Sequence, residues 1–274
     1  MACSLVFFFA VLASSIHLAL GERLNVVDFG AIADDASNEA AYANSAAILR
    51  TLLAANESAA TVLVPAGSEF HVFTTEVSGL HSVTLEVAGA LVASKNITEW
   101  LTTIVDFTAV LWFNECRGLT LTGQGTLDGQ GYDWWWANIL RGIARPHLLY
   151  VSASQDVEVS GLHFKNSPKF HCRVYDALRL HIHNIDIWVD SHAQKALLKE
   201  HNLWHELEPD SSGNPAGGGL GGIPIFPINT DGIDIRFGDI SRRLARYFLF
   251  FVTPWACCIG CVFTLFSFFP MLTS

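Results

Sequence analysis

The sequence has few charged residues, and the basic ones are the scarcer kind. Its 274 residues include 16 Lys and Arg against 26 Asp and Glu, a formal charge of −10 at pH 7. Proteins that bind nucleic acids need clustered Lys and Arg for the phosphates, so this balance excludes a nucleic-acid partner. Residues 1–21 and 247–274 have no charged residue at all. No other stretch is both apolar and uncharged over the length of a membrane span, which excludes a polytopic membrane protein.

Cysteine is also scarce and unevenly placed. Of the six cysteines, one lies within residues 1–21 and three lie within residues 247–274, which leaves Cys116 and Cys172 for the rest of the chain. These two could form one disulfide, and the sequence leaves open whether they lie close together. The C-C-x-x-C pattern in the last segment has too few ligands for a structural zinc site. We therefore expect no metal and no cofactor.

The uncharged N-terminal segment reads MACSLVFFFAVLASSIHLALG, an apolar run followed by small residues. This order is typical of a secretory signal peptide over residues 1–21. A buried N-terminal strand and a signal anchor are the alternatives. Secretion would place the mature protein outside the cell. It would also make Asn56 and Asn96 candidate glycan acceptors, because each begins an N-x-S/T sequence.

The C-terminal tail, residues 241–274, contains an uncharged run from 248 to 269 that follows three arginines. Its length and basic flank suit a membrane span, and hence membrane association, with the arginines on the cytoplasmic side. A proline, a glycine and three cysteines within it weaken the helix prediction. A glycolipid-anchor signal is a second interpretation. The third, which we favour, is translation of a wrong frame or of an intron.

Short runs of alternating apolar and polar residues recur along the middle of the chain, and each can bury one face as a β-strand. They cover residues 82–87, 118–123, 156–161 and 178–183. Within them Val83, Leu119, Val157 and Leu180 are separated by 36, 38 and 23 residues. Strands without long helices between them favour a sandwich, a barrel or a solenoid. The irregular spacing suits a solenoid best, because insertions can bulge from one side of the stack.

Two segments depart from the strand pattern. Residues 38–56 carry apolar side chains at helical spacing and predict a helix, which could cover the open end of a solenoid. Residues 191–225 begin with a helix-like stretch over 193–200 and continue through a segment rich in Gly, Ser and Pro over 209–222. We interpret 191–225 as a long inserted loop that carries a short helix.

Four stretches carry motifs whose order is informative although each motif alone is weak. They are Asn25–Ala31 (NVVDFGA) with Asp34-Asp35, Gly125–Gly131 (GTLDGQG) with Trp134-Trp135, Asn166–His171 (NSPKFH) and Asn229–Asp234 (NTDGID). Together they resemble glycoside hydrolase family 28, the polygalacturonases. The resemblance implies an all-β, right-handed parallel β-helix over residues 22–240, with residues 38–56 as its N-terminal capping helix. It also implies hydrolysis of pectin or polygalacturonate, and we expect a monomer.

The chemistry that the resemblance implies needs two carboxyl groups. An inverting glycosidase uses one to protonate the leaving oxygen and the other to activate water. The resemblance puts Asp231 in the water-activating group, with Asn229 beside it in the substrate cleft. Asp234 lies an odd number of residues further along, so on a strand it points to the opposite face. We therefore take Asp231 as the candidate catalytic residue, and Asn229 and Asp234 as candidate substrate-binding residues. Support of a turn or of the ladder is the alternative for Asp234.

The sequence departs from the family pattern after Phe237. In the family the next coil supplies a paired Asp-Asp that includes the general acid, and a Gly-His-Gly turn and a uronate-binding Arg-x-Lys pair follow. None of these occurs here. The β-helix is therefore expected to be incomplete, and one carboxylate cannot be both acid and base. We expect little or no hydrolase activity from the chain as written. The alternative is a non-catalytic pectin-binding β-helix, either membrane-tethered or vestigial.

Two further features concern sugar binding. Trp134, Trp135 and Trp136 are consecutive, so they cannot all face inward, and one of them could stack on a sugar ring or pack at the edge of the solenoid. The acidic balance of the chain would repel a polyuronate at neutral pH. A locally basic cleft, an acidic working pH or a partly esterified pectin would each resolve that conflict.

Overall fold

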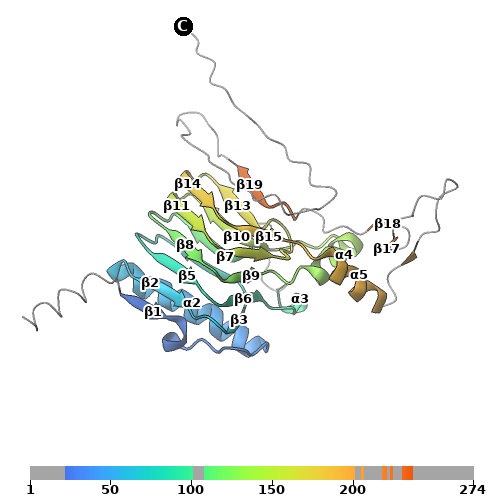
Figure 1. Cartoon of the computed structure of the whole chain (residues 1–274), viewed down its shortest axis with the longest axis horizontal. Coiled ribbons are helices and arrows are strands. Elements are labelled where there is room, and N and C mark those ends of the chain that lie inside the picture. The colour runs from blue at the N-terminus through green and yellow to red at the C-terminus, as the bar shows by residue number, and fades with distance from the viewer. Residues whose placement is uncertain are drawn as a thin grey trace, which may run out of the picture.

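The structure, a computed structural model, describes residues 22–100, 108–200, 205–206, 218–220, 223–224 and 230–236. Its strands form three long parallel sheets, here called A, B and C, and the chain passes through them in that order, coil after coil (Figure 1). Each strand inside a sheet pairs with the strand one coil earlier and the strand one coil later, and the end strands have one such partner among the described residues. This is the right-handed parallel β-helix expected from the sequence.

The strands of each sheet are given in chain order. Sheet A contains β1 (Arg23–Asn25), β2 (Thr61–Val64), β5 (Thr84–Val87), β8 (Thr120–Gly123), β11 (Gln155–Ser160) and β14 (Leu178–His183). Sheet B contains β3 (Glu69–Val72), β6 (Ala90–Ala93), β9 (Thr126–Asp128), β12 (His163–Lys165) and β15 (Asp186–Trp188). Sheet C contains β4 (Thr75–Ser78), β7 (Ala109–Asn114), β10 (His147–Ser152), β13 (Cys172–Tyr175) and β19 (Ile233–Arg236).

The core is a set of columns in which apolar side chains of successive coils stack on one another. In sheet A one column runs through Val62, Leu85, Leu121, Val159 and Ile182, all of them buried. Alternation at period two sends these side chains inward and their neighbours outward. The four runs predicted as strands from the sequence all lie in sheet A. The spacings of 36, 38 and 23 residues therefore correspond to the lengths of successive coils.

The two corners that precede sheets B and C differ sharply in length. From sheet A to sheet B the chain turns within a few residues, as at Ala88 and Gly89 between β5 and β6. An added Cβ on Gly125 would lie 2.2 Å from the carbonyl oxygen of Gly89, so stacked turns leave room only for glycine there. Three long excursions occur from sheet B to sheet C, over residues 94–108, 129–146 and 189–232.

The helices and one small sheet occupy the ends and that long corner. α2 (Asn38–Ser58) covers the first coil, as predicted, and the Ser37 hydroxyl caps it by accepting a hydrogen bond from the Ala40 amide. The short helix η1 (Val26–Phe29) precedes it. α3 (Ile97–Trp100), α4 (Tyr132–Arg141) and α5 (Ser191–Glu200) lie on one side of the stack (Figure 1). β16 (His205–Glu206), β17 (Gly218–Leu220) and β18 (Ile223–Pro224) pair antiparallel within the segment interpreted as a loop.

Several expectations concern segments beyond the described part of the chain. The signal peptide (1–21) and the uncharged run (248–269) lie outside it, as does Asn229. Among the described residues, no helix is long and apolar enough to span a membrane. Cys116 and Cys172 are both buried and both free, so they do not form a disulfide with each other. Burial raises the pKa of the Cys172 thiol to about 12, which keeps it protonated.

Candidate active site

Asp231 lies at the corner where the chain enters β19, and it is exposed. Its backbone carbonyl oxygen accepts a hydrogen bond from the His171 amide at 3.0 Å. One residue further, the Gly232 carbonyl accepts from the Cys172 amide at 3.0 Å. The ladder between β13 and β19 thus begins at Asp231, with its backbone tied and its carboxylate in solvent. A carboxylate in this position can accept a proton from water.

The side chain of His171 holds the same corner from inside. Its Nε2 accepts a hydrogen bond from the Ser167 amide at 3.3 Å. Its Nδ1 lies 3.1 Å from the Thr230 carbonyl oxygen and 3.3 Å from that of Asp231. Because Nε2 accepts, the proton must be on Nδ1, which donates to these carbonyls. Burial lowers the pKa of His171 to about 4 and keeps the ring neutral.

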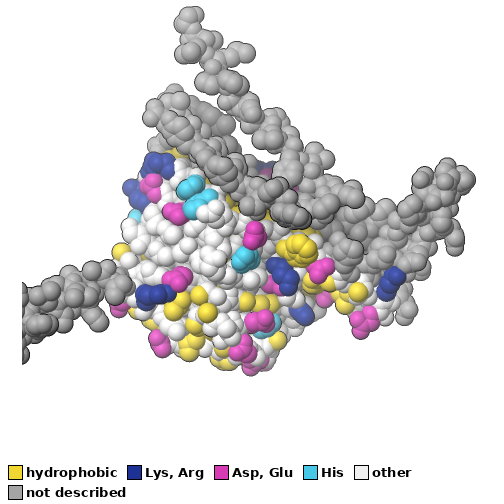
Figure 2. All heavy atoms as spheres, viewed as in Figure 1, with side chains coloured by type: hydrophobic (Ala, Val, Ile, Leu, Met, Phe, Trp, Pro, Cys, Tyr) yellow, Lys and Arg dark blue, Asp and Glu magenta, His cyan; other side chains and the backbone are white. Residues whose placement is uncertain are grey.

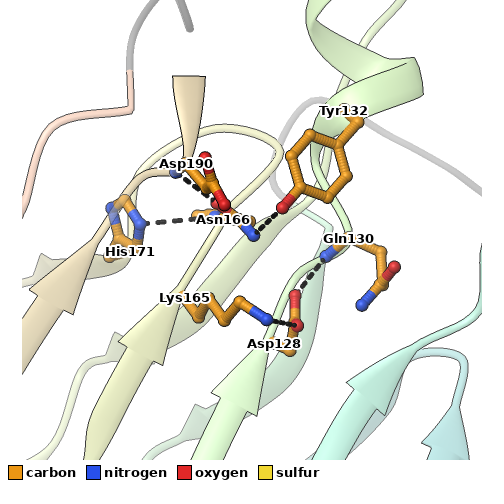
Figure 3. Close-up of polar contacts among 8 residues, drawn as sticks. Asp128, Gln130, Tyr132, Lys165, Asn166, His171 and Asp190 are labelled. Carbon is orange, nitrogen blue, oxygen red and sulfur yellow. Dashed lines mark hydrogen bonds and ion pairs between the residues drawn. The ribbon is translucent and has the colours of Figure 1, made fainter. Parts of the chain in front are cut away.

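A polar network fixes the turn from which His171 projects (Figure 3). The Asn166 side chain donates to the Tyr132 hydroxyl at 2.7 Å and accepts from the Asp190 amide at 2.8 Å. It thereby ties the turn after β12 to α4 and to the chain leaving β15. Next to it, the Lys165 ammonium lies 3.0 Å from the carboxylate of Asp128, whose other oxygen accepts from the Gln130 amide.

The glycine-rich turn of the second motif serves this same packing. A Cβ on Gly129 would lie 2.7 Å from the Asn166 carbonyl oxygen, and so would one on Gly131. The following tryptophans are mostly interior. Trp134 and Trp135 are buried, and the Trp135 indole donates to the Ser167 carbonyl at 2.9 Å. Trp136 is half-buried and donates to Asp133. Trp134 and Trp135 therefore pack inside rather than offering a face to a sugar.

Asp234 points away from the core and is engaged by two arginines. Its Oδ2 lies 3.2 Å from an Arg173 nitrogen and 3.4 Å from the Arg236 Nε. Arg173 and Asp234 occupy paired positions on β13 and β19. Asp234 therefore makes an ion-pair contact across the ladder, and both of its candidate roles, substrate binding and structural support, remain predictions. Asp231 precedes β19 and is held through its backbone, whereas Asp234 lies on β19 and contacts two arginines through its side chain.

Sequence reasoning did not find the residues next to this site on sheet C. These residues lie in the two coils that precede β19, and no local motif connects them. They are Arg145, His147, Tyr150 and Arg173. His147 could have been noticed as a polar residue at the start of an apolar run. His181 and His183 share one face of β14, and their rings stack at 4.2 Å between centroids. The described residues contain no group of three or more His, Cys, Asp or Glu side chains that could hold a metal.

The stacked sheets, with an exposed acid at a sheet C corner, define a parallel β-helix protein with a candidate carboxylate site. The sequence profile described as Glycosyl hydrolases family 28 matches residues 55–239. The chain belongs to that family.

Individual relatives agree with this assignment. A probable endo-xylogalacturonan hydrolase A from Aspergillus fumigatus is 32% identical over 127 residues, which cover 44% of this chain and 30% of the relative. A polygalacturonase from Cryptomeria japonica is 31% identical over 157 residues, which cover 54% of this chain and 29% of the relative. The chain thus spans less than a third of these relatives.

Among solved structures, a hyperthermoactive exopolygalacturonase from Thermotoga maritima matches with a TM-score of 0.52 at 18% identity. The match covers 61% of this chain and 47% of that protein. At this identity the likeness supports the fold.

Proposed function

We propose that the protein is a glycoside hydrolase of pectic polysaccharide that works by inversion, with Asp231 as the base that activates water. The observation that carries the proposal is the exposed carboxylate of Asp231 on a corner tied by the amide and ring of His171. Family membership and the names of the relatives support the substrate class. In this proposal Asn229 lies beside the sugar, and Asp234, which contacts Arg173, has two candidate roles, sugar binding and support of the ladder.

The proposed reaction needs a second carboxyl group. In inverting enzymes the two groups lie about 6.5–9.5 Å apart, with room for water between them and the sugar. Asp234 contacts Arg173 across the ladder, so we do not assign it the role of the general acid. After Arg236 the sequence contains a single acidic residue, Asp239, and no Asp-Asp pair. We therefore expect hydrolysis by the 274-residue chain to be very slow or absent.

The test is a reducing-end assay on polygalacturonate with the 274-residue chain and its Asp231→Asn variant. Asp186→Asn serves as the matched control, because Asp186 is exposed on sheet B and pairs with His163. We expect a trace rate that Asp231→Asn abolishes and Asp186→Asn retains. Normal turnover by the unmodified chain would contradict the expected impairment. A trace rate unaffected by Asp231→Asn would contradict the role of Asp231.

A second candidate function is pectin binding without hydrolysis, with a membrane tether at residues 248–269. The observation that favours it is that the exposed Asp231 carboxylate has no identified general acid as its partner at the site. Fractionation of the source tissue tests whether the native protein is attached to a membrane, as the second function requires. Release of the native protein by a carbonate wash would contradict the anchored version, whereas retention until detergent is added would support it.

Secretion and glycosylation complete the proposal. Residues 1–21 would direct secretion, and the mature protein would work outside the cell as a monomer. Asn96 is exposed, and its side chain caps α3 by accepting from the Glu99 amide. Asn56 is half-buried and accepts from the His81 amide at 2.6 Å. Asn96 is thus the better acceptor, and an Asn96→Gln variant should lose most of the mass that an endoglycosidase removes from secreted protein.

A further inference from the structure

A group of basic and aromatic side chains lies next to Asp231 on sheet C. Leu149 on β10 pairs with Cys172 on β13, which pairs with Ile233 on β19. Two residues before each of these come His147, Phe170 and Asp231, so these three residues occupy corresponding positions in successive coils. Neighbouring strands are about 4.8 Å apart, so whatever surrounds Phe170 is within reach of a sugar placed at Asp231.

Phe170 is the centre of this group. The Arg173 guanidinium carbon lies 5.6 Å from the centroid of its ring, and the Lys169 ammonium lies 5.9 Å from it. The His147 ring is 5.1 Å away on centroids. Arg173 also lies 5.9 Å from the ring of Tyr150. We call Arg145, His147, Tyr150, Lys169, Phe170 and Arg173 the basic cluster.

Burial and the positive charges of the basic cluster lower the pKa of the His147 imidazole. Burial, followed by the charges of Lys169, Arg173 and Arg145, lowers the pKa of His147 to about 3. Two of these cations, Lys169 and Arg173, also approach the Phe170 ring that His147 contacts, a concentration of positive charge that is unusual in a chain with a formal charge of −10. Elsewhere the charges are mixed: on the face shown in Figure 2, the described basic and acidic side chains occur in small groups of both signs.

His147 adds unused hydrogen-bonding capacity. Its side chain is fully buried, and neither ring nitrogen has a hydrogen-bond partner among the residues that the structure describes. Buried polar groups in native proteins are nearly always satisfied by protein, water or ligand. A neutral imidazole between aromatic rings and cations can donate to a bound anion, directly or through an ordered water.

We propose that the basic cluster is a subsite for the carboxylate of a uronic acid residue, and that it makes the protein prefer acidic to esterified pectin. The inference rests on the proposed substrate class and names residues for it. These residues differ from the Arg-x-Lys pair implied by the resemblance, which this sequence lacks. Lys169 and Arg173 provide the charge. An ammonium has three N–H donors and a guanidinium has five, so Arg173 can hold Asp234 and a ligand together.

Neighbouring groups favour such a contact energetically. The rings of Phe170 and Tyr150 exclude water on one side of the cations, which strengthens their attraction for an anion. One charge-assisted hydrogen bond to the carboxylate would raise affinity by about tenfold or more. The subsite would also resolve the conflict between an acidic protein and an anionic substrate, because it is locally basic.

The test is calorimetric titration of the full chain at low salt with trigalacturonate and with its fully methyl-esterified form. We expect the acid to bind at least about tenfold more tightly, with the difference shrinking as salt is added. Lys169→Met should remove most of that difference, because Met keeps the length of the side chain without the charge. Lys95→Met is the matched control, since Lys95 is exposed on the turn after β6. His147→Phe keeps a buried ring but no N–H, and should weaken binding of the acid.

Equal affinity for the acid and the ester, or a Lys169→Met variant that binds like the unmodified chain, would overturn the proposal. Unchanged binding by His147→Phe would overturn the assignment of His147 to the subsite. The experiment measures binding, so failure of the subsite proposal can be distinguished from failure of the proposed hydrolase function. Preference for the acid without any hydrolysis would support the subsite and contradict the proposed hydrolase function. Hydrolysis together with equal affinity for the acid and the ester would support the hydrolase function and contradict the subsite.

Discussion

His171 and Asp231 are joined twice, once by backbone and once by side chain. The His171 amide donates to the Asp231 carbonyl at 3.0 Å, and the His171 Nδ1 lies 3.3 Å from the same oxygen. The ring at the end of the NSPKFH motif therefore sets where the NTDGID motif begins its strand. Two motifs that are about 60 residues apart in sequence form one structural unit.

Replacing this ring should destabilise the protein in graded steps. His171→Asn keeps a donor near the position of Nδ1 but loses the acceptor for the Ser167 amide, and His171→Phe loses both. A buried polar group left without a partner costs about 1–3 kcal/mol. We expect urea unfolding to rank the unmodified protein first, His171→Asn second and His171→Phe last. A Phe variant as stable as the Asn variant would show that the hydrogen bonds do not matter.

Acidification should destabilise the fold through its buried histidines. Burial lowers the pKa of His171 to about 4 and that of His147 to about 3, against an ordinary value of 6.5. Between pH 6.5 and these values the unfolded chain binds protons that the folded chain does not. The free energy of unfolding therefore falls as pH falls through this window, by about 2 kcal/mol for each histidine between pH 6.5 and 4.5.

The measurement is urea unfolding at several pH values from 7.5 to 4.5. His147→Phe should flatten the profile, because it removes one of the two groups. The Asp156 carboxyl, whose pKa the Arg179 hydrogen bond lowers to about 2, takes up its proton only below this range. A stability that is constant from pH 7 to 4.5 would contradict the neutral, buried state of both rings.

The stacked turns between sheets A and B should be intolerant of any side chain. Gly125→Ala would place a Cβ 2.2 Å from the Gly89 carbonyl oxygen and 2.6 Å from that of Val87. We expect a loss of about 3 kcal/mol or failure to fold. Gly67→Ala is the control, since no heavy atom lies within 4 Å of its added Cβ. It should cost only about 1 kcal/mol, from its positive φ. Comparable losses for both variants would contradict the packing argument.

The two candidate roles of Asp234 predict opposite results for Asp234→Asn. If its contact with Arg173 supports the ladder, the free energy of unfolding should fall by about 1–2 kcal/mol, and affinity for trigalacturonate should not fall. If it binds sugar, affinity should fall and stability should not. We expect the first result, because both arginines already contact the carboxylate. Asp176→Asn, an exposed change at the end of β13, provides the baseline.

The fold was predictable because its repeating features are local in the sequence. Val83, Leu119, Val157 and Leu180 alternate with polar neighbours, and the structure stacks their strands in one sheet. Asp231 could be nominated because its motif is contiguous. The basic cluster could not, because Arg173 meets Asp234 from 61 residues away and His147 joins them only through the coil stack. A count of residues per coil would have been needed to align them.

The unequal corners also have a consequence for engineering. Between sheets A and B, turns of a few residues pack glycine against backbone. Between sheets B and C the chain already makes three excursions of different lengths without breaking the pairing of the strands on either side. A foreign peptide or a small reporter domain should therefore be grafted into the excursion at residues 94–108, where the scaffold already accommodates additional chain.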